Sequence, residues 1–100
     1  MNLSFVFFDS VRGYLQQRKV SRAAVFGSFA RGEENIHSDI DLLIEKEGLT
    51  FFEVLQMEED LEKLTHRKID IVEFGAVKTS LKSYIFKDLI KLIWETTASI

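Results

Sequence analysis

Two aspartates one residue apart, Asp39 and Asp41, stand at the start of the apolar run Leu42–Ile44. A short apolar run of this kind is typical of a β-strand, in which residues i and i+2 point to the same side. The two carboxylates are therefore expected on one face where a strand begins. Two like charges at this separation repel each other unless a cation lies between them. A divalent metal ion with oxygen ligands is the natural occupant.

A Gly-Ser pair, Gly27-Ser28, precedes the aspartates and directly follows the predicted strand 22–26. Glycine permits a tight turn and lets another backbone or a phosphate come close. Residues 28–31 then predict a single helical turn, in which free N–H groups and the Ser28 hydroxyl form an anion cradle. A Gly-Ser pair alone is a plain turn in most proteins. Its significance here comes from the strand before it and the carboxylates after it.

A third aspartate, Asp70, lies in the middle of the alternating apolar segment 68–73. Burying an unpaired carboxylate is unfavourable, so its position needs a reason. One interpretation is a solvent-facing aspartate on an edge strand. A second interpretation places Asp70 beside Asp39 and Asp41 as a third carboxylate. His37, in the polar loop before them, fits an exposed loop residue better than a metal ligand.

The remaining periodicities predict an α/β fold. The expected order is helix, strand, helical turn, strand, helix, strand, helix, over residues 3–18, 22–26, 28–31, 39–45, 51–65, 68–73 and 79–96. A whole helix connects the second and third strands, which favours a parallel pair. The shorter connection between the first and second favours an antiparallel pair. The expected sheet is thus mixed and has three strands.

The helix expected over 51–65 begins with the capping box Thr50-x-x-Glu53. We expect one apolar set on it to face the core, namely Phe51, Phe52, Leu55, Leu61 and Leu64, and its acidic run to be solvated. The last helix, 79–96, is expected to bury one apolar stripe: Leu81, Ile85, Leu89, Leu92 and Ile93.

Length and composition limit the class of protein. One hundred residues predict a single domain, 1–100, and an apolar share of 46% allows a core. No apolar run is long enough for a membrane span, so no membrane association is expected. A net charge of −3 argues against binding of long nucleic acid. The absence of cysteine is compatible with a reducing cytoplasm, which is the expected location.

The stretch from Gly27 to Glu45, GSFARGEENIHSDIDLLIE, resembles the signature of the DNA polymerase β-like nucleotidyltransferases. Its Gly-Ser, Ala30-Arg31-Gly32 and Ser38-Asp39-x-Asp41 elements occur in the order of that signature, and they are most similar to the minimal nucleotidyltransferase (MNT) proteins. Many of those are antitoxins encoded beside HEPN-domain toxins. The resemblance implies the minimal nucleotidyltransferase fold, with αβαβαβα order, and a third acidic residue on the next core strand, where Asp70 stands.

Nucleotidyl transfer depends on positioning and charge neutralisation, which two Mg²⁺ ions can supply together. Our hypothesis is that Asp39 and Asp41 bridge both ions, whereas Asp70 binds the ion nearer the acceptor and helps to remove its proton. Gly27 and Ser28 are expected to hold the phosphates of ATP. Arg31 supports the phosphates or the loop.

The resemblance also implies the acceptor, which is a tyrosine hydroxyl of a HEPN toxin that is silenced by transfer of AMP from ATP. Two other functions stay open. One is a non-catalytic antitoxin of the same fold that neutralises its partner by binding alone. The other is a small-molecule nucleotidyltransferase, acting for example on an aminoglycoside, although such enzymes usually need a longer chain to hold the sugar.

Overall fold

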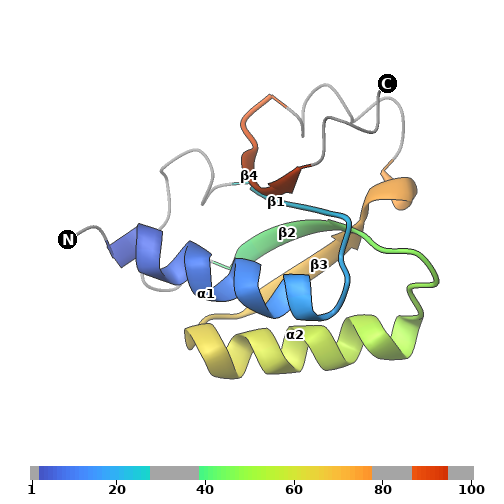
Figure 1. The fold of residues 1–100 in the computed structure, drawn as a ribbon, viewed down its shortest axis with the longest axis horizontal. Coiled ribbons are helices and arrows are strands. Elements are labelled where there is room, and N and C mark those ends of the chain that lie inside the picture. The colour runs from blue at the N-terminus through green and yellow to red at the C-terminus, as the bar shows by residue number, and fades with distance from the viewer. Residues whose placement is uncertain (1–2, 28–38, 78–86, 95–100) are drawn as a thin grey trace.

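The computed structural model describes residues 3–27, 39–77 and 87–94. Its elements, shown in Figure 1, are α1 (Leu3–Gln17), β1 (Arg22–Phe26), β2 (Ile40–Glu45), α2 (Phe51–Thr65), β3 (Ile69–Glu73), the 3₁₀ turn η1 (Phe74–Ala76) and β4 (Ile90–Trp94). The bounds expected for the first two helices and the first three strands are confirmed to within one residue. The helical turn expected over 28–31 lies outside the described residues.

The strands form one mixed sheet in the order β3-β2-β1-β4. β1 pairs with β2 and with β4 in antiparallel fashion, and β2 pairs with β3 in parallel. The α/β class and both expected strand directions are thus confirmed, because α2 carries the chain from the end of β2 back to the start of β3. The expected number of strands was wrong, since the sheet has four.

The fourth strand corrects the helix that we expected over 79–96. Ile90–Trp94 is β4, and residues 78–86 and 95–100 lie outside the described part of the chain. A bulge explains the misleading period, because Ala23 pairs with Ile93 but the next residue, Ala24, pairs with Lys91. The extra residue lets Leu92 and Ile93, adjacent in sequence, both contact the core. Consecutive apolar residues break the alternation that identifies a strand.

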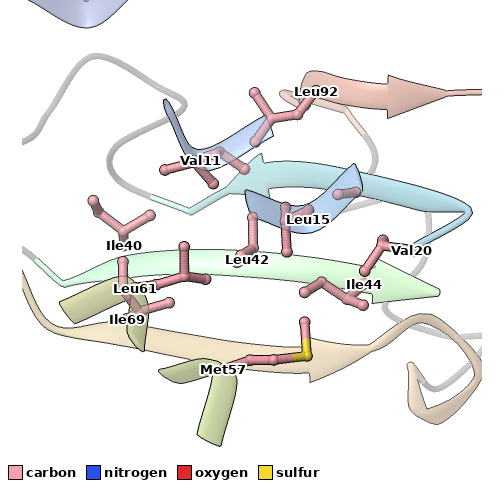
Figure 2. Close-up of a cluster of buried hydrophobic side chains, with 12 residues drawn as sticks. Val11, Leu15, Val20, Ile40, Leu42, Ile44, Met57, Leu61, Ile69 and Leu92 are labelled. Atoms are coloured by element: carbon pink, nitrogen blue, oxygen red, sulfur yellow. The ribbon is translucent and has the colours of Figure 1, made fainter. Parts of the chain in front are cut away.

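Both helices cover the same face of the sheet, and the core lies between them and the strands (Figures 1 and 2). Val11 and Leu15 of α1 pack beside Met57 and Leu61 of α2. Val20 and alternate strand residues complete this cluster, the latter being Ala23, Val25, Ile40, Leu42, Ile44, Ile69 and Leu92. Successive side chains of a strand point to opposite sides of the sheet, so one set of side chains enters the core and the other set lies on the opposite face.

The apolar residues that α2 buries are not the set that we expected. Of the five apolar residues expected in the core, only Leu61 is buried, whereas Phe51, Phe52, Leu55 and Leu64 are exposed. The capping box is confirmed on one side, since the Glu53 N–H donates to Thr50 Oγ1 at 3.2 Å. The Glu53 carboxylate does not complete it and instead pairs with Lys46 at 3.1 Å. The helix ends at His66, which is left-handed at φ 59°.

Two acidic residues of α2 reach the outer edge of the sheet. The N–H of Ile71 donates to Glu58 Oε2 at 2.8 Å, and the N–H of Ile69 donates to Glu62 Oε2 at 3.4 Å. Edge strands present such N–H groups without a strand partner. The acidic run that we expected to be solvated is thus partly structural, because these carboxylates bind α2 to β3.

A third acidic residue of α2 joins the two helices. The Tyr14 hydroxyl donates to Asp60 Oδ2 at 2.5 Å, and Arg18 donates to the same oxygen at 2.9 Å. Burial of the phenol, together with the hydrogen bond to Asp60, raises the pKa of Tyr14. The same hydrogen bond lowers the pKa of Asp60. Both shifts favour the form in which the phenol is the donor and the carboxylate the acceptor.

Within residues 3–27, 39–77 and 87–94, neither helix combines the length and apolar character needed to cross a bilayer.

Candidate active site

Strand register places two of the three aspartates opposite each other. β2 and β3 are parallel, and the Cα of Asp41 lies opposite the Cα of Asp70. Asp39 directly precedes β2 and is two residues before Asp41. The intervening Ile40 and its partner Ile69 both enter the core (Figure 2), so the aspartates belong to the opposite face. Neighbouring strands are about 4.8 Å apart, which places Asp41 and Asp70 within reach of one ion or one substrate.

Gly27 closes this end of the sheet on the other side of Asp41. Phe26, the last residue of β1, pairs with Asp41, and Gly27 follows with φ +79°. A Cβ added at Gly27 would collide with Oδ2 of Asp41 and would lie 3.2 Å from its Cγ. Glycine is therefore required twice, for the left-handed backbone and for the approach of the carboxylate. Gly27, the first residue of the predicted turn, lies beside the predicted aspartate Asp41. Ser28, Arg31 and His37 lie outside the described residues.

The side chains of the three aspartates are half-buried. Among the residues that the structure describes, no three His, Cys, Asp or Glu side chains are gathered closely enough to hold a metal ion together. The aspartates thus share one face and one end of the sheet without forming a closed ligand set. This arrangement fits Mg²⁺, because Mg²⁺ usually takes one or two carboxylates and completes its shell with waters and substrate phosphates. The assignment of the ion to Asp39, Asp41 and Asp70 stays a prediction.

The opposite end of the same face carries a cluster that sequence reasoning missed. Arg22 of β1 donates to both carboxylate oxygens of Glu45, at 2.9 and 2.8 Å. Its guanidinium carbon lies 4.1 Å from the ring centroid of Phe74 and 5.3 Å from that of Trp94. The Arg22 hydrogen bond lowers the pKa of Glu45, which keeps that carboxylate ionised. The cluster depends on the register that pairs Arg22 with Glu45 across the two strands. No sequence motif identifies it.

Comparison with known proteins identifies the class to which this fold and site belong. The family described as "Polymerase beta, Nucleotidyltransferase" matches residues 9–97. That match spans most of the chain, and the chain belongs to this nucleotidyltransferase family. The resemblance carried by residues 27–45 is thereby confirmed, and the substrate class is a nucleotide.

Individual relatives narrow the comparison. The protein adenylyltransferase MntA of Thermococcus cleftensis is 37% identical over 73 residues, which cover 72% of this chain and 70% of that protein. A solved structure of a provisionally named minimal nucleotidyltransferase matches with a TM-score of 0.76 at 30% identity, covering 90% of this chain and 95% of the other. These likenesses confirm the minimal nucleotidyltransferase fold.

A third comparison is structural only. A solved complex of the tri-AMPylated HEPN toxin of Shewanella oneidensis with its MNT antitoxin contains a chain that matches with a TM-score of 0.75. The identity is 17%, and the match covers 97% of this chain and 76% of the other. At this identity the likeness concerns the fold.

Proposed function

We propose that this chain transfers AMP from ATP to a hydroxyl, in our hypothesis a tyrosine, of a HEPN-family partner protein and thereby acts as its antitoxin. The observation that carries the proposal is the placement of Asp41 opposite Asp70, next to the turn at Gly27. The family supplies the reaction class, and the name of the Thermococcus cleftensis relative supplies the type of acceptor. The Shewanella oneidensis complex supplies the kind of partner. We propose the cytoplasm as the location, in keeping with a chain that lacks cysteine.

In this reaction the acceptor oxygen attacks the α-phosphorus of ATP, a P–O bond forms, and pyrophosphate leaves. When bound, two Mg²⁺ ions would supply charge neutralisation at the α-phosphate and at the leaving group. Asp39 and Asp41, at the start of β2, would hold these ions. Asp70, on the neighbouring strand, would help to hold them and would receive the hydroxyl proton.

The phosphates are assigned to the turn that follows β1. Gly27 has no side chain, so its backbone can approach the β- and γ-phosphates closely. We assign the Ser28 hydroxyl to the same phosphates and Arg31 to their outer side or to support of the loop. The close approach of Gly27 to the Asp41 carboxylate supports this assignment, because it places the first residue of the turn beside a proposed metal ligand.

The test is AMP transfer by single Asp→Asn variants. The wild-type chain, its HEPN-family partner, ATP and Mg²⁺ are expected to give a partner whose intact mass rises in steps of one AMP. Asp39→Asn and Asp41→Asn should lower the transfer rate by about 100-fold or more, since even outer-shell partners of metal ligands contribute about 10- to 100-fold. Asp9→Asn, on the exposed side of α1, is the matched control and should transfer normally. Full activity of Asp41→Asn without added metal refutes the assignment.

A second function is neutralisation of the partner by binding alone, without AMP transfer. The same variants separate the two functions. A chain that acts by binding still protects growing cells from the toxin when Asp39 or Asp41 is replaced by asparagine, whereas an enzyme does not.

A further inference from the structure

The beginning of α2 carries an exposed apolar surface formed by Phe51, Phe52 and Leu55, called here the α2 patch. Their exposed fractions are 72%, 82% and 46%. The two rings contact each other edge to face, with centroids 6.4 Å apart. Single exposed apolar residues are normal, but two neighbouring phenylalanines that both face solvent are not. Aromatic anchors of this type dominate the energetics of protein interfaces.

The α2 patch lies away from the core and away from the aspartates. Met57 and Leu61 are the buried residues of α2, and the patch occupies a different side of the same helix. α2 begins where β2 has ended, whereas Asp41 lies at the start of β2. Figure 1 shows these two places at opposite ends of the sheet. A protein bound to the patch therefore does not cover the aspartates. Another part of the same bound protein can then reach them.

The charge of α2 indicates the chemistry of that protein. The helix contains five acidic residues, namely Glu53, Glu58, Glu59, Asp60 and Glu62, and one basic residue, Lys63. It is thus more negative than the whole chain, whose net charge is −3. Glu59 follows Leu55 by four positions, so it extends the side of the helix on which the patch lies, whereas Glu58 accepts from the Ile71 N–H of β3. The surface is apolar at its start and acidic beyond.

A second copy of this chain is a poor occupant. A contact between two α2 helices brings together two strongly acidic segments, which repel each other.

We propose that the α2 patch is the docking surface for the protein substrate, which presents an apolar groove bordered by lysine or arginine. This inference rests on the proposed function, because the substrate is the HEPN-family partner. Phe51 and Phe52 enter the groove, and the acidic side of α2 faces its basic border. Docking and chemistry then occur at two ends of one small domain, and the acceptor hydroxyl reaches the aspartates from a bound partner.

The test compares serine substitutions on the two sides of α2. Leu55 and Leu64 have the same exposed fraction, 46%, and lie nine positions apart, which is about 180° around the helix. Phe52→Ser should weaken binding of the HEPN-family protein of the same genome by about 30-fold or more, as expected of an interface anchor. Leu55→Ser should weaken it less, and Leu64→Ser should leave it unchanged. Thermal unfolding by circular dichroism, equal in all three, excludes a folding defect.

Kinetics separate docking from chemistry. With Phe52→Ser the KM for the partner should rise while kcat at saturation stays normal, because the aspartates are untouched. Asp41→Asn should do the reverse and bind normally without transferring AMP.

Three results would overturn the inference. Normal partner affinity of Phe52→Ser refutes the docking surface and leaves the proposed function intact. A wild-type chain that neither binds nor modifies the partner refutes both. Light scattering that shows a wild-type dimer and a Phe52→Ser monomer assigns the patch to a second copy instead.

Discussion

Replacing Gly27 by alanine tests whether the turn after β1 sets the position of the Asp41 carboxylate. Gly27 has φ +79°, and an added Cβ would collide with Asp41 Oδ2. A left-handed non-glycine residue costs about 1–2 kcal/mol, of which about 0.4–1 kcal/mol is offset because alanine restricts the unfolded chain. Moving the Asp41 side chain off its rotamer adds about 0.5–1.5 kcal/mol.

Gly48→Ala is the matched control for this substitution. Gly48 has φ +73°, but an added Cβ there has nothing within 4 Å. Both substitutions therefore carry the same backbone penalty, of about 0–1.6 kcal/mol after the offset, and only Gly27→Ala displaces Asp41. We expect Gly27→Ala to be less stable than Gly48→Ala by about 0.5–1.5 kcal/mol, or several degrees in Tm.

Urea unfolding of the two variants measures this difference, and AMP transfer measures its consequence. Gly48→Ala should transfer AMP at the wild-type rate, whereas Gly27→Ala should be severely impaired because one carboxylate is displaced. If the two variants unfold at the same urea concentration and transfer AMP equally fast, the packing of Gly27 against Asp41 does not organise the site.

Two further predictions concern stability. Arg22 lowers the pKa of Glu45 from its ordinary value of 4.5, so the pair stabilises the fold above that pH and loses this contribution as pH falls through the lower, folded-state pKa. Because both side chains are partly exposed, Glu45→Gln should lower the free energy of unfolding by only about 0.2–1 kcal/mol at neutral pH. Urea titrations at about pH 3 should show a smaller difference between the variant and the wild type. An unchanged difference at acid pH would contradict the ion pair. Leu61→Ala, at a fully buried position, should lower the free energy of unfolding by about 2–5 kcal/mol, whereas Leu55→Ala should lower it by less than about 1 kcal/mol. Equal losses in urea unfolding would contradict the observed orientation of α2.

Strand faces and strand directions were predictable because they follow from local rules. The alternation around Asp41 and around Asp70 gave the face of each carboxylate, and the helix between them gave a parallel pair. What local rules do not contain is register. That Asp41 pairs with Asp70, rather than with a neighbour two residues away, depends on how α2 packs and how long its connections are.

Two of the wrong predictions, the last helix and the buried side of α2, have separate physical causes. β4 was mistaken for part of a helix because a bulge places Leu92 and Ile93 in contact with the same core. The face of α2 was mistaken because this helix has apolar residues on more than one side. Phe51, Phe52 and Leu55 have helical spacing, as Met57 and Leu61 do, and only packing against the sheet decides which set is buried.

The carboxylates of Glu58 and Glu62 that accept from the N–H groups of Ile71 and Ile69 have a consequence for self-association. A foreign strand adding to this margin of the sheet would have to displace both acceptors from donors that they already satisfy. Such growth becomes possible once α2 has come away from β3. On this side of the molecule, addition of a strand from another chain would therefore require local opening of α2 first.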